Sequence, residues 1–583
     1  MILKALYDYY QRCGDLAPEG FEDKEIQFIL RIDKNGKFLN IEDNRPANKK
    51  EKGKTFQVVR SVGRTGTKFE SNILWDNEEY VLNYLPGENE DAALKSQKKH
   101  GLFVDKVKEL SKLYPYNEKF LAVQRFYELD QKDAIKSDTY WAEIVKKPAV
   151  NLSFRLNDDR TIVAEEDDIG TYIRAAKGVD TLEYVCLVTG KKGKPILTHP
   201  KIKMGTKTQT VLVAFQKDSG YNSFGHSQGM NAPISESAVL AYTTALNHLL
   251  ESGSKNKFYA GNRTFLFWAS SHTEATQKTE TGIFNMFSNN ENDDPNRRID
   301  QVKKVFSAID SGTLKTTLED KFYILGLAPN AARIAVVYWE ECPLRDFAKR
   351  ILKHFEDMEI VDRRKDKKPY FGLHSILSAV ALPGKESKVQ PNLPEAIIKS
   401  ILQATPYPYT LFMACINRIR TEVGEKKKEA VTITRAAIIK AYLNRLNNNY
   451  KKIETMIDKE NPNQGYLCGR LFATLEYLQE RSNGIHSIRE RYMNAASATP
   501  AAVFSTLLNL SVHHAEKLEK GGQIYFEQLK TEIISKISSE GFPAHLDLQD
   551  QGRFMVGYYH QRQEFYTSKS GKQDNVTSNN QEQ

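Results

Sequence analysis

Residues 220–250, GYNSFGHSQGMNAPISESAVLAYTTALNHLL, pass from a polar loop punctuated by glycine into an amphipathic helix. The apolar residues Val239, Tyr242, Leu246 and Leu249 are spaced three and four apart, which places them on one helical face. A proline and a serine precede this face, where a fixed φ and a side-chain acceptor favour a helix start. The stretch therefore predicts a stiff loop mounted on a buried helix.

The loop is rich in amide side chains. Asn222, Gln228 and Asn231 each offer a hydrogen-bond donor and an acceptor together. That pairing matches the edge of an adenine in the major groove. We therefore interpret these three residues as candidates for DNA base recognition, or for wedging beside the base step that is read.

The same loop also fits G-x-S-x-G, with Ser227 as the serine. In the α/β-hydrolases this motif needs a strand that leads directly into the first glycine and a helix that follows the second. The apolar strand candidate at residues 211–215 ends well before Gly225, and residues 231–233 separate Gly229 from the helix. A serine hydrolase using Ser227 is therefore an alternative that its context disfavours.

Seven further segments, spread over nearly the whole chain, carry a family resemblance by their order and number. They are MILKALYDYYQRC at the start, NILWDNEEYVL (72–82), CLVTG (186–190), APNAARIAVVYW (328–339), GYLCGRLFATLEYLQ (465–479), RYMNAASATPAAVF (491–504) and FPAHLDLQDQGRFMVGYYHQRQEFY (542–566). Together with the central loop and helix, these segments resemble the large subunit of the type I-C CRISPR surveillance complex, called Cascade. None of them is a catalytic fingerprint.

This resemblance implies a non-catalytic, DNA-binding subunit of an RNA-guided complex. Such a chain recognises the protospacer-adjacent motif in double-stranded target DNA, starts strand separation and R-loop formation, helps to hold the displaced strand, and recruits a separate nuclease-helicase. The implied partners are the guide RNA, the target DNA and the other Cascade subunits (backbone, guide-processing and small subunits). In RNA-guided systems the protein reads a short duplex signal and base pairing reads the long sequence.

Further candidate contacts lie outside the central loop. A basic, glycine-containing stretch at residues 60–68 leads to Asn72, and we expect Lys68 to contact phosphate or a base acceptor and Asn72 to lie beside a base edge. Arginines are expected to contact the DNA or RNA backbone from exposed positions; they are Arg60, Arg64, Arg333, Arg470, Arg489 and Arg491. A third possibility is a purely structural scaffold that contacts only protein subunits.

The pattern of the chain predicts an α+β fold: a mixed α/β N-terminal region with short antiparallel strands, then an all-α helical bundle. Residues 26–32 and 37–41 are expected to pair across an Asn-Gly turn, and residues 322–327 and 333–339 across Pro-Asn. Residues 271–298 are polar and predict an exposed excursion.

The predicted domains are residues 1–382, a linker at 383–394 rich in proline, a bundle at 395–567 and a disordered tail at 568–583. The family resemblance adds that the C-terminal part is also translated separately as a small subunit. Met456 would begin such a product, covering residues 456–583.

Composition and motifs exclude several further classes of protein. The chain has 583 residues, a formal net charge of +9 and five scattered cysteines without a C-x-x-C pair. The moderate basic excess is compatible with a polyanionic partner. The scattered cysteines favour a cytoplasmic protein without a disulfide framework or a cysteine zinc site. We find no signal-peptide core, membrane span, P-loop or H-E-x-x-H motif. We therefore expect no membrane association, no metal, no cofactor and no enzymatic activity.

Overall fold

A computed structural model describes residues 1–578 except for a set of short segments. Those segments are 15, 47–53, 63, 65–68, 85–89, 147–149, 177–183, 205–209, 217–221, 223, 288–294, 332, 363–370, 382–389, 391, 425–428, 447–449 and 486, and the side chains of 90, 174–176, 295–300 and 567–578 are also not described. The chain divides into two compact units, Met1–His248 and Leu249–Gln583. Each unit is described by itself.

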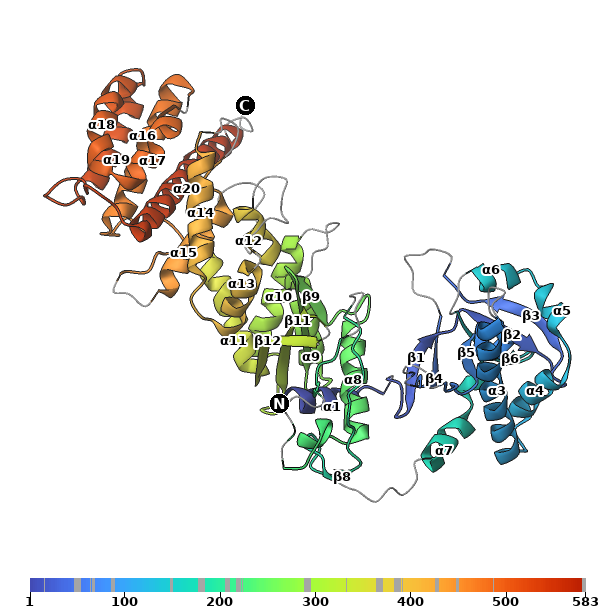
Figure 1. The fold of residues 1–583 in the computed structure, drawn as a ribbon. Helices are drawn as coiled ribbons and strands as arrows, with labels where there is room; N and C mark the ends of the chain where they lie inside the picture. The colour runs from blue at the N-terminus through green and yellow to red at the C-terminus, as the bar shows by residue number, and fades with distance from the viewer. Residues whose placement is uncertain are drawn as a thin grey trace. The chain divides into compact units, whose positions relative to one another are not determined.

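Unit 1 is built around a four-stranded sheet in the order β3-β2-β6-β5 (Figure 1). A separate antiparallel pair joins β1 to β4, and β7 pairs with β8. The elements are α1 (Ile2–Arg12), β1 (Phe21–Glu25), β2 (Phe28–Ile32), β3 (Phe38–Asp43), β4 (Thr55–Val59), β5 (Trp75–Asn77), α2 (Glu78–Leu82), α3 (Glu90–Leu113), α4 (Glu118–Glu128), α5 (Lys132–Lys136), α6 (Trp141–Lys146), β6 (Asn151–Leu156), α7 (Asp167–Ala176), β7 (Tyr184–Val185), β8 (Lys192–Gly193) and α8 (Glu236–Leu250), in which the boundary between the units falls.

The predicted hairpin between β2 and β3 is confirmed, and its turn shows why the sequence specifies it. Asp33 Oδ1 accepts hydrogen bonds from the backbone N–H of Asn35 at 2.9 Å and of Lys37 at 2.8 Å. Gly36 has φ +80°, and a Cβ atom there would lie 2.4 Å from the backbone nitrogen of Phe126. One pairing in the sheet differs from the predicted antiparallel pattern, because β2 and β6 run parallel.

Unit 2 begins with a four-stranded antiparallel sheet in the order β12-β11-β10-β9 and continues as helices to its end (Figure 1). The elements are β9 (Lys257–Ala260), β10 (Arg263–Ala269), α9 (Glu274–Phe287), α10 (Pro295–Asp310), β11 (Lys321–Asn330), β12 (Arg333–Pro343), α11 (Leu344–Met358), α12 (Leu373–Val380), α13 (Leu393–Gln403), α14 (Tyr409–Glu422), α15 (Ile433–Arg445), α16 (Gln464–Asn483), α17 (Ser487–Ala498), α18 (Pro500–Ala515), α19 (Lys520–Ile534) and α20 (Leu548–Ser578). The α+β fold class is therefore confirmed.

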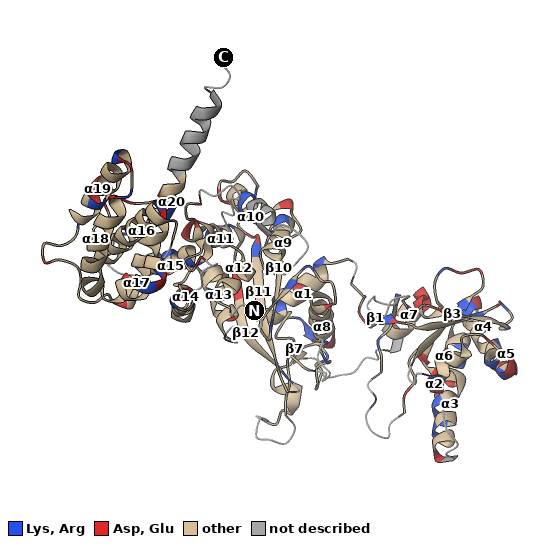
Figure 2. Ribbon diagram, turned by 90° about the horizontal axis from the view of Figure 1, so that it is seen from above, with Lys and Arg blue, Asp and Glu red and all other residues tan. Residues whose placement is uncertain are grey.

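The core of unit 2 joins the sheet to the helices that follow. Helices α9 and α11 contact strands of the sheet, and apolar side chains of both enter one continuous cluster with the strands. Figure 2 shows the strand β11 largely free of charged residues, as expected of a strand that is buried over most of its length. No helix in the part of the chain that the structure describes is long and apolar enough to cross a membrane.

The predicted exposed excursion at residues 271–298 is wrong over much of its length, because α9 packs into this core. Ala275, Thr279 and Ile283 are buried on one face of the helix. The Thr279 hydroxyl donates to the carbonyl of Ala275 at 2.8 Å, so the helix itself satisfies a buried polar group. The polar composition of residues 271–298 was therefore not a reliable sign of solvent exposure.

Glycines bring the backbones of α16 and α20 into contact. A Cβ atom at Gly465 would lie 2.4 Å from the carbonyl oxygen of Asp550, and one at Gly469 would lie 2.0 Å from that of Phe554. On the opposing helix, a Cβ atom at Gly557 would lie 2.2 Å from the carbonyl oxygen of Tyr466. No residue other than glycine fits at these three positions without separating the helices.

Two predicted boundaries are not settled by the fold. Most of the predicted linker lies in residues 382–389 and 391, outside the described residues, so a division there stays a prediction. The boundary of the compact units falls instead between His248 and Leu249. At the C-terminus, α20 continues as helix to Ser578, past the predicted start of the tail at residue 568.

We predict that Gly469→Ala destabilises unit 2, because the added methyl group forces α16 and α20 apart. Overpacking of this kind costs about 1–3 kcal/mol, and here the obstacle is a backbone carbonyl that cannot move aside. Urea unfolding of the full chain, followed by helical circular dichroism, measures the change. Gly521→Ala in α19 is the matched control, because nothing lies within 4 Å of a Cβ atom there. An unchanged midpoint for Gly469→Ala would contradict the close crossing.

Candidate nucleic-acid interface

Asn72, predicted to lie beside a base edge, is a buried residue of unit 1 with 4% of its surface exposed. Its Oδ1 accepts a hydrogen bond from the backbone N–H of Val62 at 2.9 Å. Its own backbone N–H donates to Asp76 Oδ2 at 3.0 Å. These contacts fix the start of the basic loop against the segment that leads into β5. Lys68, the other residue predicted here, lies outside the described residues.

Arg64 is held by the same carboxylate as Asn72. Its Nη2 forms an ion pair with Asp76, its Nε donates to the carbonyl of Glu70 at 2.8 Å, and its guanidinium lies 4.1 Å from the centre of the Tyr80 ring. Burial raises the pKa of Asp76, and the ion pair with Arg64 acts in the opposite direction. Arg64 therefore anchors the loop, whereas the sequence predicted a side chain directed at phosphate.

Arg60, at the end of β4, connects that strand to α8. Its Nη2 donates to Thr244 Oγ1 at 3.2 Å, and its buried Nε has no hydrogen-bond partner among the residues that the structure describes. Burial lowers the pKa of Arg60, while Glu22 and other groups favour its charged form. The side chain is therefore less available to a polyanion than the sequence predicted.

The amides of the central loop brace the loop itself. Asn222 Oδ1 accepts from the backbone N–H of Gln228 at 3.2 Å. Asn231 Nδ2 donates to the carbonyls of Gln228 at 2.9 Å and of His226 at 3.4 Å. Gln228 itself has φ +46°, a left-handed conformation that is uncommon for a residue with a side chain.

The base of this loop is tied closely to the chain before it. A Cβ atom at Gly229 would lie 2.2 Å from the carbonyl oxygen of Ile196, and the N–H of Gly229 donates to the carbonyl of Leu197 at 3.1 Å. Ser235 Oγ accepts from the N–H of Ala238 at 3.4 Å, which gives α8 the cap that the sequence predicted. The loop is therefore a braced element on a buried helix.

Phe224 was not predicted and is the most distinctive side chain of the loop. It is 98% exposed and has φ +50°, next to Gly225 with φ +77°. An exposed aromatic ring on a braced loop is available to stack on, or to insert between, nucleic-acid bases. The signal in the sequence was a lone phenylalanine within a polar, glycine-rich run, which a search for base-edge donors and acceptors does not single out.

The hydrolase alternative does not fit the geometry around Ser227. Its backbone is extended, with φ −115° and ψ 143°, and it precedes a short 3-10 turn at Gln228–Asn231, whereas α8 starts only at Glu236. Residues 211–215 form no regular strand leading to Gly225. Among the described residues, no histidine is hydrogen-bonded to the Ser227 hydroxyl. The arrangement is therefore not a nucleophile elbow.

Two of the four arginines predicted to contact nucleic acid from unit 2 are largely enclosed. Arg470 is fully buried, with 0% exposed: its Nη2 lies 2.9 Å from Glu532 Oε1 and its Nε donates to Gln561 Oε1 at 3.1 Å. The predicted exposure of Arg470 is wrong, because α19 and α20 cover that face of α16. Arg489 lies 3.8 Å from buried Glu476 and is mostly enclosed. Arg333 and Arg491 are exposed.

The model of the family described as CRISPR-associated protein (Cas_Csd1) matches residues 6–566. No curated protein matches the chain. Within the described residues, no group of three or more His, Cys, Asp or Glu side chains is placed to hold a metal ion.

We predict that Asn72→Ala loosens the loop that follows β4, because the N–H of Val62 loses its acceptor. A buried group left unsatisfied costs about 1–3 kcal/mol. Hydrogen exchange of the full chain should show faster exchange of the Val62 amide. Asn222→Ala, which removes an amide acceptor from the other loop, should leave that amide unchanged. If Asn72→Ala removed binding to motif-bearing DNA without changing exchange at Val62, the bracing role would be wrong.

Proposed function

Because the chain belongs to the Cas_Csd1 family of CRISPR-associated proteins, we propose that it is the large subunit of a type I-C Cascade complex that recognises the protospacer-adjacent motif in duplex DNA. Membership of this family supports a protein of a Cascade-type complex. In it the chain is non-catalytic, opens the duplex beside the motif, helps to form the R-loop and recruits a separate nuclease-helicase.

The observation that carries this proposal is the exposed ring of Phe224 on a braced loop. Proteins that open duplexes insert apolar wedges between base steps, and unstacking a step costs about a few kcal/mol. A ring that stacks on a freed base returns about 1–3 kcal/mol. Asn222, Asn231 and Gly229 already hold this loop in place. The conformational entropy lost by the loop on binding DNA is therefore small.

Base reading is assigned to the amides that flank this ring. The side chain of Gln228 has no hydrogen-bond partner among the described residues, so its donor and acceptor are available to a base edge. Asn222 is exposed and uses Oδ1 within the loop, which leaves its Nδ2 as a donor. Asn231 braces the loop through its hydrogen bonds to the carbonyls of His226 and Gln228. Lys68, which lies outside the described residues, is retained as a proposed contact to phosphate or base.

The remaining contacts follow from this role. Guide RNA and partner subunits are expected to hold most of the heteroduplex, and Arg333 and Arg491 are the exposed arginines proposed to contact nucleic-acid backbone. A purely structural scaffold is the second candidate. It is favoured by one observation, that Arg60, Arg64 and Arg470 serve contacts within the chain.

We predict that Phe224→Ala reduces duplex opening at the motif. Loss of one base–ring stack of about 1–3 kcal/mol corresponds to a decrease of roughly 5- to 150-fold in the equilibrium for strand separation. The measurement is the fluorescence of 2-aminopurine placed beside the motif, in duplexes bound by the guide-loaded complex. Phe224→Trp should retain opening, because it keeps an aromatic face.

Leu318→Ala in unit 2 is the matched control, because Leu318 is also 98% exposed but lies outside the loop. The same assay includes complex assembled without this chain and duplexes without the motif. Motif-dependent opening that persists without the chain would leave only the scaffold role. Equal losses for Phe224→Ala and Leu318→Ala would remove the wedge from the proposal.

We also propose that the C-terminal part is made separately as a small subunit starting at Met456. Met456 is 56% exposed in the connection that precedes α16. In the full chain, α20 packs against α14 and α15, where Gly552 lies beside Phe412 and Ile439. A product without these helices would expose that face, which suits a subunit that is stable only within the complex.

We predict that intact mass spectrometry of complex expressed from the full gene detects a fragment beginning at or near Met456. Met456→Leu, which replaces an exposed side chain and removes the start codon, should abolish this fragment while the full chain persists. Absence of any such fragment from the unmodified complex would eliminate this start site.

A further inference from the structure

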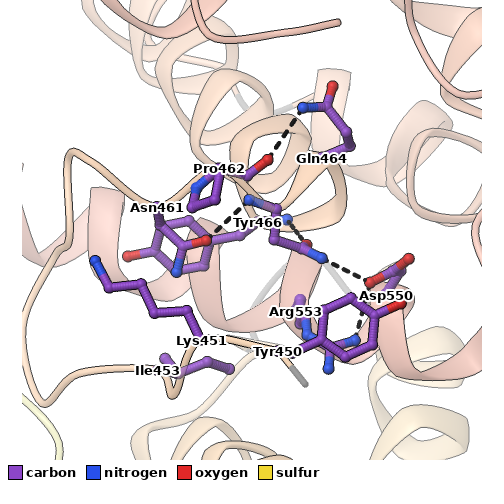
Figure 3. Close-up of a pocket in the computed structure, with 10 residues that line it drawn as sticks. Tyr450, Lys451, Ile453, Asn461, Pro462, Gln464, Tyr466, Asp550 and Arg553 are labelled. Atoms are coloured by element: carbon purple, nitrogen blue, oxygen red, sulfur yellow. Dashed lines mark hydrogen bonds and ion pairs between the residues drawn. The ribbon is translucent and has the colours of Figure 1, made fainter. Parts of the chain in front are cut away.

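A hollow of about 350 Å³ lies in unit 2 where the N-terminal ends of α16 and α20 meet (Figure 3). Its walls come from the connection between α15 and α16 and from the first turns of the two helices. Its polar lining includes Tyr450, Lys451, Asn461, Asn463, Asp550 and Arg553. The hollow is distinct from the loops of unit 1 that carry the proposed function.

Arg553 is a buried cation with unused donors. Only 3% of the residue is exposed, and its Nη1 donates to Asp550 Oδ1 at 2.9 Å. Its guanidinium lies 4.0 Å from the centre of the Tyr450 ring. Its Nε and Nη2 have no hydrogen-bond partner among the described residues. These two nitrogens form one edge of the guanidinium fork, which suits a pair of acceptors.

Asn461 supplies a second unused donor. It is 2% exposed, and its Oδ1 accepts from the backbone N–H of Asn463 at 3.0 Å. Its Nδ2 has no partner among the described residues, although the residue lines the hollow. Both groups can therefore donate to a ligand in the hollow that carries acceptors.

The charge of the hollow argues against a free phosphate as this ligand. The Asp550 carboxylate offsets the charge of Arg553, and it also accepts from Asn463 Nδ2 at 2.9 Å. Lys451 is paired with Asp458 at 2.7 Å. A neutral ligand with acceptors on one edge therefore fits better than a dianion. The Tyr450 ring lies against the Arg553 guanidinium and orients its free edge.

We propose that this hollow binds one unstacked nucleobase of single-stranded nucleic acid, with two acceptors on one edge. Guanine has this pattern, because its O6 and N7 pair with an arginine fork. The free edge of Arg553 reads the two acceptors, the Tyr450 ring lies against the guanidinium and holds it in place, and Asn461 donates to the rim of the base. Lys452, which is exposed, contacts the neighbouring phosphate.

The proposed base-binding hollow is complete only in the full chain. Tyr450 and Lys451 precede Met456, so a small subunit beginning at Met456 would lack the ring that holds Arg553 in place. This inference also does not depend on motif recognition, because its ligand is a single strand without a motif. If the Phe224 wedge in unit 1 proved wrong, the proposed base-binding hollow would not be affected. If the hollow proved wrong, the wedge would not be affected.

The test uses the full chain and oligo-dT strands that contain either no purine or a single central dG, with a terminal fluorophore for anisotropy. We expect the dG strand to bind more tightly than oligo-dT, and Tyr450→Ala to weaken its binding by roughly tenfold. Tyr450→Phe should bind as the unmodified chain does. Tyr525→Ala is the matched control, because Tyr525 on α19 is exposed to a similar degree, 45% against 50% for Tyr450.

A second measurement locates the base directly. A strand with 6-thioguanine in place of the single dG is irradiated on the unmodified chain, and mass spectrometry should find the crosslink within residues 450–466 or 550–553. A crosslink elsewhere, or equal binding of oligo-dT and the dG strand, would overturn the proposal. It would also be overturned if Tyr450→Ala left strand binding unchanged but prevented assembly with the other subunits, because the hollow would then hold a protein group.

Discussion

The contact between the backbones of α16 and α20 is the constraint on which the C-terminal part of unit 2 depends. At Gly465, Gly469 and Gly557, the carbonyl of the opposing helix occupies the space where any other residue would place a Cβ atom. Helices this close enclose the side chains around their crossing, polar ones included. The buried pairs of Tyr558 with Glu476, at 2.6 Å, and of Tyr466 with His560, at 2.9 Å, satisfy groups that the crossing removes from water.

The helices could be predicted from the sequence, but the environment of Arg470 could not, because it depends on this contact between helices. Apolar spacing predicted the two hairpins and the C-terminal helices, although not α9, because period is a property of the local sequence. It also suggested that Arg470 is exposed, because the residue lies outside the apolar stripe of α16. Its partners Glu532 and Gln561 are supplied by later helices, and local patterns do not contain that information. Where the crossing begins, at Gly465 and Asp550, the helix ends leave the hollow beside Arg553.

The candidate site in unit 1 shows a related limit. Residue type identified Asn72, Asn222 and Asn231 as polar groups able to contact a base, and the structure places each of them in a hydrogen bond within its own loop. An amide that braces a loop and an amide that reads a base look the same in a sequence. Phe224 was missed for the opposite reason, since an isolated phenylalanine is usually part of a core, and only the structure shows it 98% exposed.

Net charge is a poor guide to how this chain would hold nucleic acid. Several arginines that contribute to the +9 excess serve internal carboxylates: Arg64 pairs with Asp76, Arg435 with Glu422 and Arg445 with Asp357. An arginine committed in this way releases few counterions on binding a polyanion, so the excess charge overstates the electrostatic contribution. Besides the exposed Arg333 and Arg491, the features available to a ligand are the Phe224 ring on a braced loop and the free guanidinium edge of Arg553. In our proposals these two features would select unstacked bases over intact duplex, a preference that total charge cannot provide.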